Sequence, residues 1–383
     1  MAPIVIIGAG MAAYSVAREL RKLDKTVPLL VIAGDAAGAY SKPMLSNAIA
    51  MGKGAHQLVS HSAEQMAAQL GATVLAHTHA SAIDPAARSV TTSQGSFQYS
   101  ELVLALGAAP IRLPIEGDGA AEVLSVNHLD DYAELRRRLD KVGRAAHVAI
   151  IGAGLIGCEF ADDLLAGGHE VTLVDPNAVP LAALAAPSLS KGLAKAWQGK
   201  RVNLKLGTTV LSASKSGEQV QLVLASGELL TADLVLSAVG LRPSITLAQA
   251  AGLETRRGIV IDAHGRTSAA GIFALGDCAE YTTASGSAVM PYVAPLLAAA
   301  RAIASTLAGS PMPIELNNDA VIVKTPSYKL ALAPPPVGMA GTWIDEHDSE
   351  RTISRFVDAT GTVRGFGLSA HTLALRQKLL AEM

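Results

Sequence analysis

One pattern occurs twice along the 383 residues and limits the folds open to the chain. An apolar run leads into a glycine turn, a stretch of helical periodicity follows, and a second apolar run ends close to an acidic residue, over residues 4–35 and again over 148–175. Each copy predicts a β-α-β unit. Parallel strands buried on both faces read as continuous Val, Ile and Leu runs, and two more such runs, each followed by a glycine, start at Leu102 and Leu234. The pattern predicts an α/β protein with two Rossmann-like dinucleotide-binding domains.

The first glycine turn has the form G-x-G-x-x-A. Gly8 permits the tight turn, Gly10 lets the backbone approach a pyrophosphate, and the small Ala13 allows the helix to pack closely on the strand with its N-terminus facing the phosphates. Asp35, which follows Gly34, is positioned to accept hydrogen bonds from an adenosine ribose.

The second turn contains Gly152, Gly154 and Gly157, and Asp175 ends its second strand. A carboxylate at that position suits the free ribose hydroxyls of NADH and repels the extra phosphate of NADPH, and the nearest following cation is the distant Lys191. One such turn is weak evidence, because ordinary strand-to-helix turns share it. Two complete units indicate a redox relay in which the first binds FAD and the second admits NADH.

The sequence also predicts how the chain divides into domains. The FAD-binding domain is expected to comprise residues 1–113 and 238–310, and the inserted NADH-binding domain residues 114–237. From about Pro311 the sequence pattern changes to short strand-like runs and a last helix, which predicts a small α+β domain over residues 311–383. Its strands are expected at residues 321–323, 330–332, 351–357 and 363–368.

Charge and apolar patterning exclude several classes of partner. The formal net charge of -2 offers no general attraction for nucleic acid or anionic membranes. The longest apolar span, 289–309, contains Pro291, Pro295 and Arg301, so no membrane-spanning helix is expected, and the absence of an export signal predicts a cytoplasmic location. The two cysteines have no metal-ligand or disulfide spacing, so they are interpreted as buried thiols and no metal is expected.

Together these residues resemble the FAD-dependent pyridine nucleotide-disulfide oxidoreductase superfamily. The run from Ile272 to Asp277 resembles its second FAD motif, and two further marks lie at 106–110 and 239–243, with Leu106 replacing the usual threonine. Within the superfamily, the chain is most similar to rubredoxin-NAD reductases and flavorubredoxin reductases. That likeness is carried by residues 40–46, 152–160, 274–280 and 323–326.

The resemblance implies two sets of cofactor-binding residues. The FAD set is Gly8, Ala9, Gly10, Met11, Ala12, Gly34, Asp35, Lys42, Ala80, Glu159, Asp277, Val293 and Lys324. The NAD set is Gly152, Gly154, Gly157, Asp175 and Gly240. In the FAD set, Lys42 is implied to lie against the flavin, Ala80 to offer its backbone to the adenine, and Asp277 to hold the ribityl hydroxyls.

Three further FAD residues are implied to surround the isoalloxazine. Glu159 approaches the ring, Val293 begins the helix beneath the pyrimidine, and Lys324 reaches in from the third domain. Each charged residue also has a structural interpretation: Lys42 as a solvated loop residue, Glu159 as a favourable charge near a helix N-terminus, and Lys324 as a strand lysine that extends to solvent.

Residues that relatives use are missing here. No C-x-x-x-x-C pair follows the first unit, so a redox disulfide is excluded, and electrons are expected to leave singly for an iron protein. Related ferredoxin reductases carry a second lysine five residues after the position of Lys42, and that second lysine pairs with the glutamate that matches Glu159. In this chain Asn47 occupies the position of the second lysine. We hypothesise that Lys324 partly replaces it by placing positive charge near the reduced flavin.

The resemblance therefore implies an NADH-dependent flavoprotein reductase that delivers electrons through FAD to rubredoxin, a small and usually acidic iron protein, as in alkane-hydroxylase-type electron chains. No catalytic side chain is assigned with certainty, and Glu159 and Lys324 are expected to tune the flavin. Lys42, Lys324 and Lys329 are candidates for a docking surface. Two alternatives stay open: a reductase of a ferredoxin or flavorubredoxin, and a flavin-bearing redox sensor that does not turn over.

Overall fold

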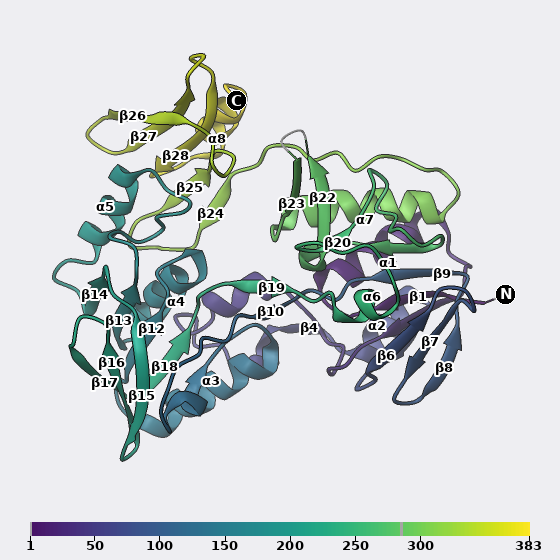
Figure 1. Ribbon diagram of the computed structural model, residues 1–383, viewed down its shortest axis with the longest axis horizontal. Coiled ribbons are helices and arrows are strands. Elements are labelled where there is room, and N and C mark those ends of the chain that lie inside the picture. The colour runs from purple at the N-terminus through teal and green to yellow at the C-terminus, as the bar shows by residue number, and fades with distance from the viewer. Residues whose placement is uncertain (1, 284–285) are drawn as a thin grey trace. The chain divides into compact units, whose positions relative to one another are not determined.

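The structure is a computed structural model that describes residues 2–283 and 286–383 (Figure 1). Its contacts divide the chain into two compact units. Unit 1 comprises residues 2–42, Gln57–Ala109 and Leu241–Asn317. Unit 2 comprises Pro43–His56, Pro110–Gly240 and Asn318–Met383.

Unit 1 is built on a parallel five-stranded sheet in the order β21-β9-β1-β2-β5. Its strands are β1 (Ile4–Ile7), β2 (Leu29–Ile32), β5 (Thr73–Leu75), β9 (Glu101–Leu104) and β21 (Ile272–Ala274). Its longer helices are α1 (Met11–Leu23), α2 (Ala63–Leu70) and α7 (Val293–Leu307). The central β1 aligns Ile4 with both Leu29 and Glu101, so the carboxyl ends of these strands lie at one edge.

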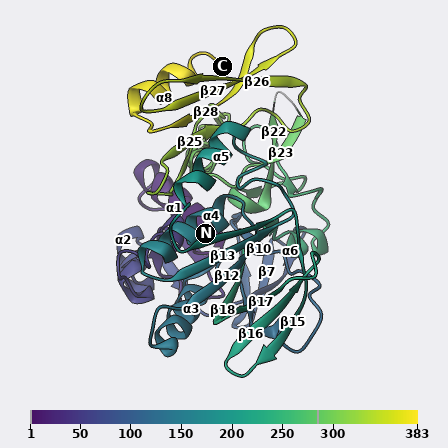
Figure 2. The ribbon, with the colours of Figure 1, turned by 90° about the vertical axis from the view of Figure 1, so that its left-hand side faces the viewer.

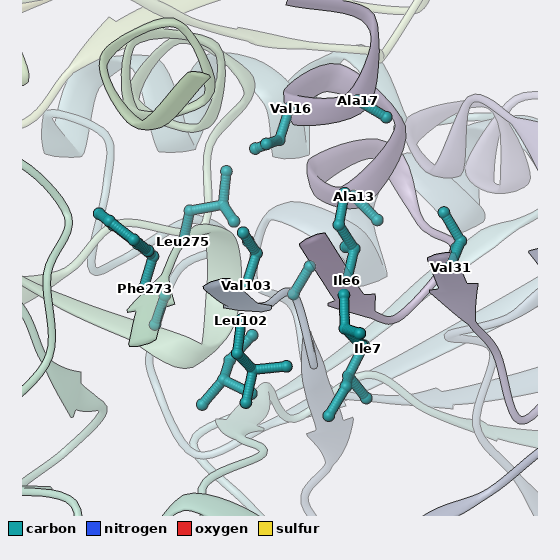
Figure 3. Close-up of a cluster of buried hydrophobic side chains, with 14 of the residues drawn as sticks. Ile6, Ile7, Ala13, Val16, Ala17, Val31, Leu102, Val103, Phe273 and Leu275 are labelled. Carbon is teal, nitrogen blue, oxygen red and sulfur yellow. The ribbon is translucent and has the colours of Figure 1, made fainter. Parts of the chain in front are cut away.

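Apolar side chains of this sheet and of α1 form the core of unit 1. In Figure 3, Ala13 and Val16 of α1 face Ile6 and Val103 of the sheet. All four side chains are completely buried. Burying a large aliphatic side chain contributes roughly 1.5–3 kcal/mol, so this core holds the glycine turn after β1 in place.

Smaller elements complete unit 1. Its remaining strands, mostly antiparallel, are β3 (Ala39–Tyr40), β4 (Val59–His61), β6 (Ala80–Asp84), β7 (Ser89–Thr92), β8 (Gly95–Gln98), β20 (Ile259–Val260), β22 (Ala279–Thr283) and β23 (Gly286–Val289). The short helix α6 spans Thr246–Ala250, and β10 (Ala108–Pro110) pairs with β19 (Leu241–Pro243). The apolar span at 289–309 begins at the end of β23 and contains α7, and no described helix is long and apolar enough to cross a membrane.

Unit 2 repeats the parallel design in the order β11-β18-β12-β13-β14. The strands are β11 (Val123–Leu124), β12 (His147–Ile151), β13 (Glu170–Asp175), β14 (Val202–Leu206) and β18 (Leu234–Ser237). The helices are α3 (Leu129–Val142), α4 (Leu155–Ala166) and α5 (Pro187–Ala196). An antiparallel sheet adds β15 (Val210–Ser216), β16 (Gln219–Leu224) and β17 (Leu229–Ala232).

The C-terminal part of unit 2 is an antiparallel sheet with one helix, α8 (Leu373–Leu380), as Figure 2 shows. In sheet order its strands are β24 (Val321–Val323), β25 (Leu330–Ala333), β28 (Val363–Ser369), β27 (Thr352–Asp358) and β26 (Gly341–His347). The α/β class with a small α+β domain is confirmed, and four of these strands were predicted to within two residues. The sequence analysis missed β26 because this edge strand is mostly exposed and lacks apolar alternation.

Helix α5 packs against β27 and β28, which joins the C-terminal sheet to the second parallel sheet. A Cβ on Gly367 would lie 2.3 Å from Cδ1 of Leu189, so a larger residue there would force the Leu189 side chain to move. The hydroxyl of Ser188 donates to Asp345 at 2.9 Å. The predicted NADH-binding and C-terminal regions therefore form one unit by contact, and the three-domain boundaries stay a prediction.

Candidate functional site

In unit 1 the predicted FAD residues gather at the carboxyl edge of the sheet. The turn that contains Gly8 follows β1, Asp35 follows β2, and Asp277 follows β21. Neighbouring parallel strands end at the same edge, where open α/β sheets bind their ligands. A Cβ on Gly276 would lie 3.1 Å from Cβ of Ala12, which places the Asp277 loop against the start of α1.

The two glycines of the first turn serve different needs. Gly8 has φ +114°, and a Cβ there would lie 2.3 Å from the carbonyl oxygen of Ala105, so the fold itself requires this glycine. Gly10 has no atom within 4 Å of the position a Cβ would take, and as the N-cap of α1 it provides no side-chain hydrogen bond. Open space beside free helix N–H groups fits a pyrophosphate, so the turn suits FAD.

Asp35 keeps a carboxylate available at this edge. The residue is exposed, and one of its oxygens accepts the backbone N–H of Ala37 at 2.9 Å. A Cβ on Gly34 would lie 2.7 Å from the ring of His79, so Gly34 and the start of β6 at Ala80 lie close together. The structure thus brings three of the predicted adenosine-binding residues to one place.

Lys42 and Asp277, the two residues implied to lie along the flavin and its ribityl chain, are neighbours. The ammonium nitrogen of Lys42 lies 3.8 Å from Oδ2 of Asp277, and both side chains are partly exposed. Val293 is the first residue of α7, and its N-cap, Tyr292, makes no side-chain cap. The N-terminal N–H groups of α7 therefore remain available for an acceptor.

The second turn, in unit 2, repeats the geometry of the first. Gly152 has φ +105°, and a Cβ there would lie 2.7 Å from the carbonyl oxygen of Ala238. A Cβ on Gly157 would lie 2.0 Å from the carbonyl oxygen of Gly152, whereas one on Gly154 would meet no atom within 4 Å. Again the middle glycine leaves space for a ligand, and the outer two are required by close backbone packing.

Asp175 differs from Asp35 in that its carboxylate is buried and fully engaged. Oδ2 accepts the backbone N–H of Ala153 at 2.7 Å, and Oδ1 accepts both the backbone and side-chain N–H of Asn177 at 2.8 Å. The carboxylate therefore braces the glycine turn, a role that the sequence analysis did not foresee. Gly240, also predicted for NAD, has φ +109°, and its carbonyl accepts the N–H of Ile111 at 3.0 Å.

The predicted pair Glu159 and Lys324 meets directly. Oε1 of Glu159 accepts the backbone N–H of Lys324 at 3.1 Å, and Oε2 is ion-paired with the Lys324 ammonium. The hydroxyl of Ser46 donates to Oε2 at 2.7 Å, and the same ammonium donates to Ser46 at 2.8 Å and to the carbonyl of Pro43 at 2.6 Å. Asn47 therefore does not leave Glu159 without a cation, because Lys324 supplies it.

Two further carboxylates on α4 were missed. Asp162 accepts the indole N–H of Trp197 and the backbone N–H of Ser327, both at 2.8 Å. Asp163 accepts the N–H groups of Ile49 at 3.0 Å and Ala50 at 2.8 Å, and burial raises its pKa. Both side chains are buried. Their spacing from Glu159, three and four residues along a helix, was the available signal that all three share a face.

Helix α4 thus holds two distant segments of unit 2 with buried acceptors. Glu159 and Asp163 fix residues 43–50, while Glu159 and Asp162 fix residues 324–327. An unpaired buried N–H or carboxylate costs free energy, so each of these bonds restricts the loop that carries its donor. The arrangement gives Lys324 a set position relative to the second glycine turn.

Both cysteines are buried thiols, as predicted. Burial raises the pKa of Cys278 to about 11 and that of Cys158 higher still. Each Sγ donates to a backbone carbonyl, Cys158 to Ala153 at 3.2 Å and Cys278 to Leu275 at 3.3 Å. Within the part of the chain that the structure describes, no group of three His, Cys, Asp or Glu residues is arranged to hold a metal ion.

Comparisons with known proteins agree with this site. The family model for pyridine nucleotide-disulphide oxidoreductases matches residues 2–300, and the model described as rubredoxin binding C-terminal domain matches residues 313–383. The chain belongs to the pyridine nucleotide-disulphide oxidoreductase family, whose members use FAD and NAD(P)H. The family resemblance drawn from the sequence and the expected enzyme class are confirmed.

Individual proteins similar to this chain include reductases named for particular electron acceptors. The chain is 40% identical to the rubredoxin-NAD(+) reductase of Acinetobacter baylyi, over 100% of this chain and 98% of that protein. It is 35% identical to the nitric oxide reductase FlRd-NAD(+) reductase of Aeromonas hydrophila, over 99% and 96%. Among solved structures it resembles the covalent putidaredoxin reductase-putidaredoxin complex, with a TM-score of 0.90, 26% identity and coverage of 100% and 94%.

Proposed function

We propose that this protein is an NADH-dependent flavoprotein reductase whose electron acceptor is rubredoxin. The observation that carries the proposal is a pair of glycine turns, each with a middle glycine that faces open space, in a chain whose C-terminal 71 residues match a rubredoxin-binding family model. A full-length relative at 40% identity carries the name of that activity.

The chain's own residues have defined parts in this activity. Gly10 and Gly154 leave the N-termini of α1 and α4 open to the diphosphates of the two dinucleotides. Asp35 has a free carboxylate oxygen for the adenosine ribose, and Asp277 and Lys42 provide a polar lining for the flavin side of the site. We infer that FAD is held tightly without a covalent bond, because the open helix N-terminus at Gly10 and the carboxylates of Asp35 and Asp277 offer non-covalent contacts along the cofactor.

When bound, FAD supplies the conversion of a two-electron donor into a one-electron donor. The protein contributes orientation and a fixed electrostatic environment. Glu159, Lys324 and Ser46 form a hydrogen-bonded group whose ammonium, in the proposal, faces the flavin and favours negative charge on it. Asp175 has two roles in the proposal. Its hydrogen bond to Ala153 orients the second turn, and its negative charge repels a 2′-phosphate, which favours NADH over NADPH.

The proposal is tested with the purified protein. Flavin absorbance at about 450 nm should bleach rapidly on addition of NADH and slowly with NADPH. Reduction of rubredoxin should then be compared with reduction of a ferredoxin panel under the same conditions. A colourless protein that does not retain FAD after reconstitution would overturn the proposal.

A second acceptor is favoured by one observation: the Aeromonas relative is named for reduction of a flavorubredoxin, and it covers the chain almost completely. Inclusion of a flavorubredoxin in the acceptor panel separates the two, since the preferred acceptor has the higher kcat/KM. Slow, weak bleaching by NADH with no acceptor reduced would instead favour a redox sensor. A cytoplasmic location stays a prediction from the sequence.

A further inference from the structure

Few cations in the C-terminal part of unit 2 lack an ion pair, and they lie beside β25 and on α8. Lys324, Arg351, Arg355 and Arg364 each form an ion pair. Within residues 318–383, all of which the structure describes, the cations without an ion pair are Lys329, Arg376 and Lys378. Of the three lysines that the sequence suggested for docking, only Lys329 keeps its charge free of such a pair.

Lys329 and Arg376 both carry positive charge near His371. The backbone N–H of Ala370 donates to the carbonyl of Lys329 at 3.0 Å, which brings the start of β25 beside the residue that precedes His371. The pKa of His371 is lowered by burial and then by the positive charges of Arg376 and Lys329, as expected for an imidazole that follows Ala370 and precedes α8. The Nε atom of Arg376 is buried and has no hydrogen-bond partner.

An exposed leucine lies in the same region. Leu373, in the first turn of α8, is 62% exposed, while Leu379 of the same helix is completely buried in the C-terminal core. Leu373 and Arg376 are three residues apart and so share a side of the helix. The fold buries Leu379 and packs Leu375 and Leu380 partly against the same core, whereas packing within the chain does not account for the exposed Leu373.

We propose that Lys329, His371, Leu373 and Arg376, named here the α8 patch, form the docking surface for an acidic electron-carrier protein. The inference rests on the proposed function and specifies where the acceptor binds. An apolar centre with a rim of one charge is the arrangement that transient protein interfaces use, since the charges steer encounter and the apolar residue anchors the complex. Unpaired cations attract an acidic partner without first having to break an internal ion pair.

The experiment uses the FAD-loaded protein and rubredoxin as the probe. The variant Lys329→Glu combined with Arg376→Gln reverses one positive charge and removes the other, and Leu373→Ser removes the apolar anchor. Matched controls in unit 1 are Lys25→Glu and Leu23→Ser, since Lys25 is also an exposed lysine and Leu23 is 57% exposed. The readouts are KM for rubredoxin at low and high salt, rubredoxin affinity by calorimetry, and NADH-driven reduction of ferricyanide.

The charge variant should raise KM for rubredoxin about tenfold at low salt, and most of the salt dependence seen in the wild type should disappear. Leu373→Ser should weaken binding severalfold at every salt concentration. Ferricyanide reduction and the controls should match the wild type, because the small acceptor needs no docking surface.

Two failures are distinguishable. Equal KM and equal salt dependence in the wild type and the charge variant would overturn the α8 patch while leaving the proposed function in place. A wild-type protein that bleaches with NADH and reduces ferricyanide but not rubredoxin would overturn the proposed acceptor and, with it, this docking site.

Discussion

Glu159 and Lys324 are joined twice, through the backbone N–H of Lys324 to Oε1 and through its ammonium to Oε2. The carboxylate side chain is 2% exposed and the lysine side chain 25% exposed. The two charges therefore cancel at close range, and the local field depends on both partners. The sequence analysis offered Lys324 as a partial replacement for the lysine that pairs with this glutamate in relatives, and the structure shows the two residues as a direct pair that Ser46 completes.

The pair predicts opposite outcomes for a single and a double substitution. Lys324→Met should lower the flavin midpoint potential and the melting temperature, because it leaves a buried carboxylate uncompensated; breaking a fully buried pair costs about 3–5 kcal/mol, and partial exposure reduces that cost. Lys324→Met with Glu159→Gln should restore most of both quantities. Spectroscopic redox titration and thermal unfolding measure them. An unchanged potential in the single variant would contradict the pairing's role at the flavin.

The middle glycines predict separable cofactor defects. Gly10→Ala should weaken FAD retention, and Gly154→Ala should raise KM for NADH while FAD stays bound, because the added Cβ would occupy the space proposed for the phosphates. Neither should lower the melting temperature of the apoprotein, because a Cβ at either position meets no protein atom. Gly8→Ala is the matched contrast: its Cβ would clash with Ala105, so it should destabilise the apoprotein itself. Equal destabilisation by Gly8→Ala and Gly10→Ala would refute this division.

Replacing Asp175 should affect the turn as well as nucleotide choice. Asp175→Ala leaves the N–H of Ala153 without its acceptor, a loss of about 1–3 kcal/mol, so kcat/KM for NADH should fall about tenfold or more. The ratio of NADPH to NADH use should rise, since the carboxylate no longer repels the phosphate. Asn177→Ala, which removes a side-chain donor to Asp175, is the milder control. Steady-state kinetics with both nucleotides measure this ratio. An unchanged ratio of NADPH to NADH use in Asp175→Ala would contradict the prediction.

The thiols should be inert in the folded protein. Burial raises the pKa of Cys278 to about 11 and raises that of Cys158 further, and the thiolate is the reactive form. Alkylation should therefore remain negligible as the pH rises from about 7 to about 9, and both cysteines should react after denaturation. Mass spectrometry after iodoacetamide treatment measures this. Rapid labelling of either cysteine in the native protein would show that it is accessible.

Asp163 should make a pH-dependent contribution to stability. Its pKa is raised by burial, so the folded protein binds this proton more tightly than the unfolded chain does, and that stabilisation is lost as the pH rises from the ordinary value of 3.8 through the raised one. Asp163→Asn should lower stability by about 1–3 kcal/mol because one of two N–H donors loses its acceptor. The deficit should shrink between about pH 4 and pH 7.

Thermal unfolding across that pH range checks the prediction, with Asp130→Asn as the control. Asp130 is exposed, so its substitution should change stability by no more than about 0.5 kcal/mol. A deficit that grows with pH would show that Asp163 stabilises the fold as the charged form, against the direction argued from burial.

The sequence by itself determined the two parallel sheets, the glycine turns and most of the C-terminal strands. These features depend on short-range rules: glycine tolerates the φ of +114° that Gly8 needs, and buried strands and amphipathic helices have their own periodicities. Local pattern was sufficient wherever the relevant neighbours lie within a few residues. Strand β26 was not predicted, because an exposed edge strand lacks the alternation of apolar and polar residues.

Only the tertiary structure decided which side chains meet. Ser46 lies 113 residues from Glu159 and 278 from Lys324, and no periodicity relates positions so far apart. Asp175, predicted as a ribose ligand, likewise has a second contact that only the fold reveals, because the N–H of Ala153 donates to its carboxylate. Such contacts arise because packing brings distant segments together and a buried polar group must find a partner there, and the identity of that partner is set by the folded arrangement as a whole.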